Sequence, residues 1–499
     1  MLPEIKNAPE RFKNQLAKYL VLRNPQCINC GTCAVVCPYQ VHQRPAGYKR
    51  MSQPVHERCI GFRCLKNDFC CVHHCPRQAL KLELNPLWET LGDARWPADL
   101  LKATWLQAET GEPTSSGLAY NYQTGQSGGG FDRLQFKNTD SSPVKINDNQ
   151  VDTSLQLNKR PFGPKITIPI PVYGGGMSFG SIGLATMLAR AKAAQAWGTF
   201  ISTGEGGYPE ELAPYDNHII TQVATGLFGV SERSLQRVRF MEFKYAQGAK
   251  PGLGGHLLGD KNTPSVAKFR EAVPGTSLFS PFPFHSVYSV EDHKKHVDWI
   301  KAINPNILVS VKVSTPTDID MVTVGSYYAG AHIVHLDGAY GGTGAAPEIA
   351  KKNIAMPIEY AVPKVHRFLC AEGIRDEITL IASGGIRTAL DVAKVIALGA
   401  DGVVIGTAEL VALGCVRCGN CESGRGCPRG IATTDPELEK LIDADWGAQR
   451  IINMYRAWLK YWLQLLKKLG LTSFKELRGR MDLLEYGTRE MEEEEKIQI

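Results

Sequence analysis

The sequence lacks the features that would place it in several common classes of protein. No apolar run among its 499 residues approaches the roughly 20 that span a bilayer, and charges interrupt residues 1–21, so we expect neither a membrane span nor a signal peptide. The net charge of +6 is mild and gives no indication of nucleic-acid binding. No Gly-x-Gly-x-x-Gly turn follows a predicted first strand, so an NAD(P)H-binding fingerprint is missing.

Cysteine, by contrast, is concentrated. Almost all of the 14 cysteines fall into three tight groups, and Cys370 stands alone. Secreted disulfide scaffolds spread cysteines along the chain to cross-link distant segments, whereas clustered thiols indicate a reducing compartment and bound metal. We therefore expect a cytoplasmic protein that binds metal.

The first two groups have the spacing of a ferredoxin with two iron–sulfur clusters. One reads Cys27-x2-Cys30-x2-Cys33-x3-Cys37-Pro, a pattern whose last thiolate binds the other cluster. The second is looser, with Cys71-x3-Cys75-Pro repeating that ending, which makes Cys71 the ligand and Cys70 the spare. Crossover then predicts two 4Fe–4S clusters, one on Cys27, Cys30, Cys33 and Cys75 and the other on Cys37, Cys59, Cys64 and Cys71. Disulfides and structural zinc are the alternatives, but a zinc site needs neither matched runs nor a trailing Cys-Pro.

The chain divides into four parts. Residues 1–85 form an α+β domain of the bacterial ferredoxin type, with a short helix expected from Glu10 to Leu22, and 86–165 form a linker and packing segment. Residues 166–434 form the largest unit, with a third cluster of three or four irons at 415–427, on Cys415, Cys418, Cys421 and Cys427. Residues 435–499 form a helical extension that ends in an acidic tail, Glu490 to Glu495.

The largest unit has the pattern of a (β/α)8 barrel. Short runs with continuous apolar content, typical of parallel strands covered on both faces, alternate with helical stretches such as Ile182 to Trp197 and Ala389 to Leu398. The predicted strands are Ile170 to Tyr173, Thr199 to Ser202, Phe240 to Tyr245, Ser277 to Ser280, Leu308 to Val313, Ile333 to Leu336, Ile378 to Ala382 and Gly402 to Ile405. A doubly wound sheet is the competing architecture, but it would need the missing glycine fingerprint.

Glycine-rich turns follow these strands, at the end where such barrels bind ligands. Turns after the last two strands are the usual phosphate cradle, and Lys312 is a charge inside an apolar strand that needs an anion or a ligand carbonyl. A flat, phosphorylated cofactor fits these positions, and FMN is the economical choice. The alternatives are that Lys312 pairs with a structural carboxylate and that Glu205 caps a helix.

Residues 127–433 contain a set of specific motifs: Gly-Gly-Gly-Phe-Asp-Arg-Leu (128–134), Met-Ser-Phe-Gly-Ser (177–181), Thr-Gly-Glu-Gly-Gly (203–207), Ala-Gln-Gly-Ala-Lys-Pro-Gly (246–252), Tyr-Ser-Val-Glu-Asp (288–292), Val-Ser-Val-Lys (309–312), Gly-Gly-Thr-Gly-Ala (341–345) and Cys-Pro (427–428). With these motifs the segment resembles the FMN-binding synthase domain of glutamate synthase, and the fused architecture resembles its compact archaeal-type subunit.

The resemblance implies electron transfer through the clusters to FMN, and reduction of 2-iminoglutarate, made from 2-oxoglutarate and ammonia, to L-glutamate. It implies that Lys312 and Glu205 are catalytic. It also implies flavin or substrate contacts at Gly175, Met177, Ser178, Gly180, Thr203, Gln247, Lys312, Gly341, Gly342, Thr343, Ser383, Gly384, Gly385, Arg387, Gly406 and Thr407. The implied partners are an electron-donor protein, either ferredoxin or an NAD(P)H-oxidising flavoprotein subunit, and a separate amidotransferase subunit unless free ammonia is used.

Some residues depart from the family pattern. Leu253 replaces the usual Glu, Ala339-Tyr340 replaces His-Asp, and residues 313–318 lack the sequence that helps to bind the oxo acid. The family's body cluster has three irons on three cysteines, so Cys418 is an extra ligand that permits four. Two other functions therefore stay open: an FMN oxidoreductase of this superfamily acting on another substrate, such as an N-alkylated glutamate, and an electron-transfer subunit of a larger complex.

Overall fold

The computed structural model describes most of the chain. The described residues are 2–12, 16–67, 70–88, 90–114, 130–137, 146–281, 283–344, 346–347, 349–351 and 353–486. The predicted acidic tail and most of the glycine- and serine-rich segment before Asp132 lie outside them.

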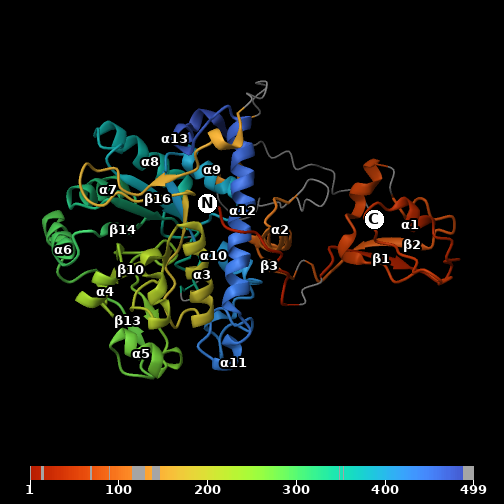
Figure 1. Cartoon of the computed structure of the whole chain (residues 1–499), viewed down its shortest axis with the longest axis horizontal. Coiled ribbons are helices and arrows are strands. Elements are labelled where there is room, and N and C mark those ends of the chain that lie inside the picture. The colour runs from red at the N-terminus through yellow and green to blue at the C-terminus, as the bar shows by residue number, and fades with distance from the viewer. Residues whose placement is uncertain are drawn as a thin grey trace.

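Eight parallel strands close into a barrel in the order β8-β9-β10-β11-β14-β15-β16-β17, which confirms the predicted fold (Figure 1). The strands are β8 (Val172–Gly174), β9 (Ile201–Ser202), β10 (Ile219–Ala224), β11 (Phe240–Lys244), β14 (Leu308–Ser314), β15 (Ile333–Asp337), β16 (Thr379–Ser383) and β17 (Gly402–Ile405). The helices around them are α3 (Leu184–Trp197), α4 (Glu232–Arg237), α6 (Val290–Ile303), α7 (Ile319–Tyr328), α8 (Ile358–Ala371), α9 (Ala389–Ala397) and α10 (Thr407–Ala412).

One predicted barrel strand is wrong. The segment from Ser277 to Ser280 contains β13 (Leu278–Phe279), which pairs antiparallel with β12 (His256–Leu257) in an excursion between β11 and β14 that also contains α5 (Pro264–Arg270). The missed strand is β10, which pairs in parallel with β9 and β11. Both segments are short and half apolar, so local pattern does not separate a barrel strand from a two-residue ribbon.

Side chains alternate between the inside and the outside of the barrel, as the two-residue period of a strand requires. The outward residues pack against the helices in one large core. The first inward residues, including Phe240, Leu308 and Ile333, are apolar and pack on the β6–β7 hairpin (Leu155–Gln156 and Thr167–Ile168). These side chains fill the barrel at the amino ends of its strands, so ligands have access only at the carboxyl ends.

The long helix α12 (Ala444–Lys468) ties the barrel to the segment before it. It packs against α3 and against α2 (Ala98–Thr110). A buried salt bridge joins Arg190 Nε of α3 to Glu409 Oε2 of α10 at 2.7 Å, and Tyr455 of α12 donates to Glu409 Oε1 at 2.7 Å. The short helix α11 (Pro436–Glu439) precedes α12. After α12 come α13 (Phe474–Leu477) and β18 (Leu484–Tyr486), and β18 pairs with β5 (Leu134–Phe136). Among the helices described, none is both long enough and apolar enough to cross a bilayer.

Residues 16–85, which we call the head, project to one side of the barrel (Figure 1). Strand β1 (Tyr19–Arg23) pairs antiparallel with β2 (Leu80–Leu84), and between them lie α1 (Thr32–Val36) and two short 3-10 helices, His56–Arg58 and Gly61–Asn67. The prediction of a helix from Glu10 to Leu22 is therefore wrong, because the residues from Tyr19 onward form β1 and pair with β2. A salt bridge from Lys18 to Asp99 of α2, 3.1 Å long, links the head to the body.

Candidate functional site

Polar groups replace apolar ones halfway up the barrel interior. Glu242 of β11 lies at the centre, fully buried, and accepts hydrogen bonds from Gln222 Nε2 at 2.7 Å and Ser310 Oγ at 3.1 Å. His335 of β15 bridges Glu242 Oε2 at 3.0 Å and Ser383 Oγ at 2.7 Å. Although burial raises the pKa of Glu242, His335 and Lys312 outweigh it, and the net shift is downward. An ionised carboxylate therefore lies beneath the mouth of the barrel.

Lys312 lies one layer higher and is paired. Its Nζ is 3.3 Å from Asp337 Oδ2, which also accepts from the backbone N–H of Gly248 at 2.9 Å, and Ser383 Oγ donates to Asp337 Oδ1 at 2.5 Å. Burial works against the ammonium, but Asp337 and then Glu242 raise the pKa of Lys312 above its ordinary value. The structural carboxylate that the sequence left open is thus present, and it keeps Lys312 charged at the point where the barrel opens.

Glu205 does not cap a helix. Its carboxylate is buried, with Oε1 3.8 Å from Lys244 Nζ and Oε2 accepting from Ser280 Oγ at 3.4 Å. Burial raises the pKa of Glu205, but Lys244, Arg270 and other cations reverse the shift and hold it below the ordinary value. Gly255 is required here, because a Cβ at that position would lie 1.6 Å from Glu205 Oε1.

Lys250 is a second buried cation beside Glu205. Its Nζ is 3.4 Å from His256 Nδ1, and burial, followed by repulsion from Lys244, lowers the pKa of Lys250 to about 8. Lys244, Lys250 and Lys312 give the mouth three ammonium groups, and Glu205, Glu242 and Asp337 give it three carboxylates. Such a site suits a ligand that carries charges of both signs.

The glycine turns bring backbone close to this mouth. The N–H of Gly175 donates to Ile405 O at 2.7 Å, and its carbonyl accepts from Arg190 Nη2 at 2.7 Å, which fixes the first turn. At Gly384, after β16, a Cβ would lie 2.6 Å from the carbonyl of Gly338. These turns leave no room for side chains, a property that a flat ligand needs.

Several predicted contacts are engaged by protein groups. Ser178 Oγ accepts from Arg270 Nη2 at 2.9 Å, and Thr203 Oγ1 donates to Ile220 O at 3.4 Å. Arg387 forms an ion pair with Asp132 and donates to the carbonyl of Arg95 at 2.9 Å. These residues hold the turns in place, and the groups left to face a ligand are mostly backbone.

The remaining predicted positions lie in the turns after β8, β11, β15 and β17. A Cβ on Gly406 would lie 3.5 Å from the methyl group of Met177, so the turns after β8 and β17 meet. A Cβ on Gly342 would lie 3.0 Å from Thr407 Oγ1, which brings together the turns after β15 and β17. Gly180, Gln247, Gly341 and Thr343 belong to these and the neighbouring turns.

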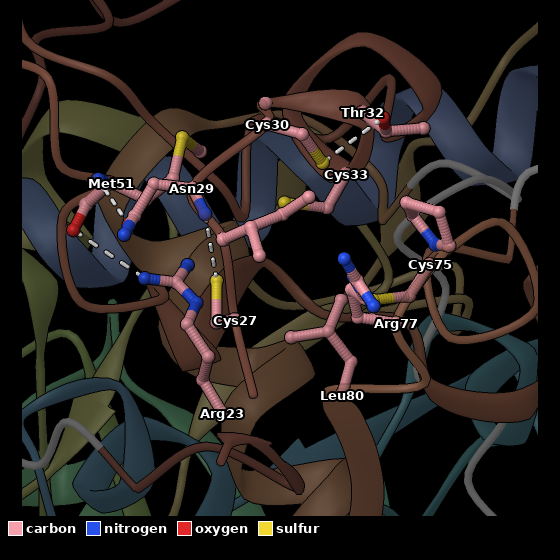
Figure 2. A pocket seen from close by; sticks show the side chains of 13 residues that line it. Arg23, Cys27, Asn29, Cys30, Thr32, Cys33, Met51, Cys75, Arg77 and Leu80 are labelled. Atoms are coloured by element: carbon pink, nitrogen blue, oxygen red, sulfur yellow. Dashed lines mark hydrogen bonds between the residues drawn. The ribbon is translucent and has the colours of Figure 1, made fainter. Parts of the chain in front are cut away.

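The four cysteines assigned to the first cluster line one pocket in the head. Figure 2 shows the side chains of Cys27, Cys30, Cys33 and Cys75 around it, together with Arg23, Met51 and Leu80. Backbone N–H groups already point at the sulfurs, from Asn29 to Cys27 at 3.4 Å and from Ala79 to Cys75 at 3.2 Å. A thiolate-lined pocket with amide donors suits an anionic iron–sulfur cluster.

The thiols assigned to the second cluster also lie near one another. Burial raises the pKa of Cys71, and the neighbouring thiols of Cys59, Cys70, Cys37 and Cys64 raise it further. The predicted spare, Cys70, is buried within this set and interacts directly with Cys64. Sequence spacing had not shown that the spare thiol would be so close.

The third group lies between the barrel mouth and the segment that leads into the head. A Cβ on Gly344, in the turn after β15, would lie 3.1 Å from Cys421 Cβ. Burial raises the pKa of Cys415 to about 11, and Cys421 and Cys427 contribute. On the far side, the guanidinium of Arg429 stacks on Phe12 at 4.4 Å.

Within the described residues, no three His, Cys, Asp or Glu side chains meet closely enough to hold a single metal ion. This does not conflict with clusters, because each thiolate of a cubane binds its own iron and the sulfurs stay apart.

Sequence reasoning missed Glu242, His335 and Asp337. The signal was available: Phe-Met-Glu-Phe-Lys (240–244) and Ile-Val-His-Leu-Asp (333–337) carry charges inside apolar strands, as the strand of Lys312 does. Lys244 is a further charge in the first of these two strands, so the same pattern could have identified it.

The chain is similar to the members of one known protein family. A family model described as a conserved region in glutamate synthase matches residues 126–472. An archaeal-type glutamate synthase (NADPH) of Thermotoga maritima is 36% identical over 484 residues, 92% of each chain. An archaeal glutamate synthase (NADPH) of Methanocaldococcus jannaschii is 36% identical over 94% of each chain. A solved flavocytochrome b2 with sulfite bound is 16% identical over 72% of this chain and 77% of that chain, with a TM-score of 0.45.

Proposed function

Because the chain belongs to the glutamate synthase family, we propose that it is an iron–sulfur flavoprotein oxidoreductase that reduces 2-iminoglutarate, formed from 2-oxoglutarate and ammonia, to L-glutamate. The observation that carries the proposal is the buried set of charges at the carboxyl ends of the barrel strands, centred on Lys312 and Asp337, inside the region that the family model covers.

FMN is the proposed cofactor at the mouth of the barrel. The turns at Gly175 and Gly384 leave backbone where a flat ring needs it, and Nη1 of the buried Arg95 has no hydrogen-bond partner among the residues described. When bound, FMN supplies the two-electron reduction of a carbon–nitrogen double bond. Lys312 offers a fixed positive charge to the electron-rich side of the cofactor or to the substrate.

The substrate would be a dicarboxylate with a positively charged imine nitrogen. Lys244 and Lys250 are buried ammonium groups that would hold its carboxylates, and the ionised Glu205 would accept a hydrogen bond from the imine nitrogen. The three side chains lie together beside Gly255 and Ser280. Their mutual pairing keeps them ready for a ligand that carries both charges.

Three clusters would deliver electrons one at a time. The head would hold two, on the thiols that line the pocket of Figure 2 and on the neighbouring set around Cys71. The third, on the four cysteines from Cys415 to Cys427, would pass electrons onward, and the contact between Gly344 and Cys421 supports that route.

Electrons would enter from a separate donor protein. Residues 16–85 contain ten Lys and Arg against three Asp and Glu, so the head has a net charge of +7, larger than the +6 of the whole chain. Among the described residues of the head, the exposed cations are Arg44, Lys49, Arg50, Arg58, Arg63, Arg77 and Lys81. Charge of one sign around the clusters favours an acidic ferredoxin or flavoprotein. Ammonia would come from free solution or from an amidotransferase subunit.

An anaerobic assay tests the proposal. The holoenzyme is supplied with 2-oxoglutarate, ammonium and reduced ferredoxin or viologen, and glutamate is quantified after flavin, iron and acid-labile sulfide have been measured. Glutamate formation supports the proposal. Its absence from a preparation with full flavin and iron would exclude it.

A second candidate, reduction of a different oxo or imino acid, is favoured by Leu253, which is 45% exposed where the family pattern has Glu. N-alkylated substrates in the same assay separate the two functions.

A further inference from the structure

The phosphate of the proposed cofactor needs a cationic partner, and the expected helix terminus does not provide one. After β16 the chain enters α9, whose N-cap Thr388 accepts from Asp391 N at 3.1 Å. Asp391 Oδ2 in turn accepts from the backbone N–H groups of Arg387 and Thr388, at 2.9 and 3.1 Å. The amides of Arg387, Thr388 and Asp391 at this helix terminus are therefore already bound to side chains of the same terminus.

The expected arginine is also occupied. Arg387 is only 2% exposed, and its guanidinium pairs with Asp132, donates to the carbonyl of Arg95, and lies 3.7 Å from Asp391 Oδ2. Two carboxylates around one guanidinium offset its charge, although Arg387 Nε has no hydrogen-bond partner among the described residues.

Arg95 is different. It lies in the turn between β3 (Gly92–Asp93) and β4 (Trp96–Pro97), yet it is only 8% exposed. Its guanidinium stacks on the ring of Tyr340 at 4.2 Å, in the turn after β15, and Nη1 has no hydrogen-bond partner in the described part of the chain.

The guanidinium lies directly against the turn after β16. A Cβ on Gly385 would be 2.7 Å from Arg95 Nη2, and Gly385 has a φ of 102°, in the region that glycine favours. Arg95 therefore reaches the glycine turn that the barrel architecture assigns to phosphate.

The nearby carboxylates favour the charged form of Arg95, but each of them pairs with another arginine. Asp93 pairs with Arg417 at 2.8 Å, and Asp132 pairs with Arg387. Burial, followed by repulsion from Arg387, lowers the pKa of Arg95 to about 10, so it stays charged at neutral pH. A buried cation whose neighbouring carboxylates are shared in this way is stabilised when an anion binds beside it.

We propose that Arg95, from outside the barrel, binds the phosphate group of FMN at the Gly384-Gly385 turn. This inference rests on the proposed function and extends it, because Arg95 precedes the region that the family model matches. Tyr340, where the resemblance expects a different residue, orients the guanidinium by stacking.

Comparing FMN with riboflavin tests the proposal, because riboflavin has the same ring and no phosphate. Full-length flavin-free protein is titrated with each ligand, and flavin fluorescence reports binding. Arg95→Gln is expected to weaken FMN binding by at least about tenfold, the effect of losing a hydrogen bond to a charged group, while riboflavin binding stays within about twofold. Arg95→Lys, which keeps the charge and loses the planar fork, is expected to fall between Gln and Arg.

A matched control is Arg239→Gln, which removes an arginine stacked on Phe200 at 5.4 Å at the amino end of β11. It is expected to change neither affinity. Equal losses for FMN and riboflavin in Arg95→Gln, or no loss for either, would overturn the proposal. If Arg95→Gln does not fold, Arg95→Lys and Tyr340→Leu carry the same comparison. If wild-type protein binds neither ligand, the proposed function itself fails.

Discussion

Replacing Lys312 by Met tests whether this lysine serves the reaction or only neutralises Asp337. The substitution keeps an aliphatic stem of similar length and removes the ammonium. Lys312 Nζ lies 3.3 Å from Asp337 Oδ2, and both side chains are nearly buried. At an effective dielectric constant of about 20, that separation corresponds to about 5 kcal/mol of attraction. Removing one partner of a buried pair leaves the other charge uncompensated, so we expect the free energy of unfolding to fall by about 3–5 kcal/mol.

The paired variant separates the two roles. Asp337→Asn alone should also destabilise the protein, whereas Lys312→Met with Asp337→Asn together should recover most of the loss, because neither charge remains. Thermal unfolding followed by circular dichroism measures these differences. Turnover should stay at least about 100-fold below wild type in both variants that lack Lys312, a typical cost of removing one electrostatic group at a reacting centre.

Lys159→Met is the matched control. Lys159 forms a part-buried pair with Asp401, at 2.5 Å, near the amino end of β17, where Arg375 and Arg478 also pair with Asp401. It should lower stability and leave turnover per folded, flavin-loaded molecule unchanged. If turnover returned in the Lys312–Asp337 double variant, Lys312 would be no more than the counter-ion of Asp337.

The other expected outcomes concern a proton, a cluster and a partner. Burial is the main cause that lowers the pKa of Lys250 to about 8, so its ammonium is lost as pH rises through that value and kcat/KM for the oxo acid should fall above about pH 8. Lys250→Arg should remove that decline. A pH profile that is the same in Lys250→Arg and wild type would exclude Lys250 as its cause. Cys75→Ser should reduce iron and acid-labile sulfide by one cluster whereas Cys70→Ser should not, and equal losses would contradict the assigned ligands. Reduction by an acidic ferredoxin should slow steeply between low salt and about 0.15 M salt, whereas reduction by a cationic viologen should not; a rate independent of salt would exclude docking on the basic head.

Much of the barrel could be predicted from the sequence, because its strands are buried on both faces and their apolar runs are continuous. The exceptions share a cause. β10, Ile219–Ala224, carries Thr221 and Gln222, and polar residues inside the barrel interrupt the run that marks a strand. The segment from Ser277 to Ser280 has the same local pattern, yet it pairs only with β12. Partners far along the chain decide between these outcomes.

The site was predictable where chemistry depends on spacing and not where it depends on distant contacts. Three of the four cysteines assigned to the first cluster lie in one short loop, and together with Cys75 they line one pocket. Arg387 matched a family position, but its charge is taken by Asp132, 255 residues away in sequence. Arg95 reaches the barrel from a turn that no barrel motif includes, so local pattern alone does not identify it.

The hydrogen bond from Tyr455 to Glu409 and the salt bridge between Glu409 and Arg190 have a consequence for how this chain can be divided. Arg190 also fixes the carbonyl of Gly175, so a residue of α12 shapes the first turn of the barrel. A recombinant fragment ending before Ala444 would leave Arg190 and Glu409 uncovered and would loosen that turn. A fragment meant to fold by itself must therefore extend past the last barrel strand, β17, and include α12.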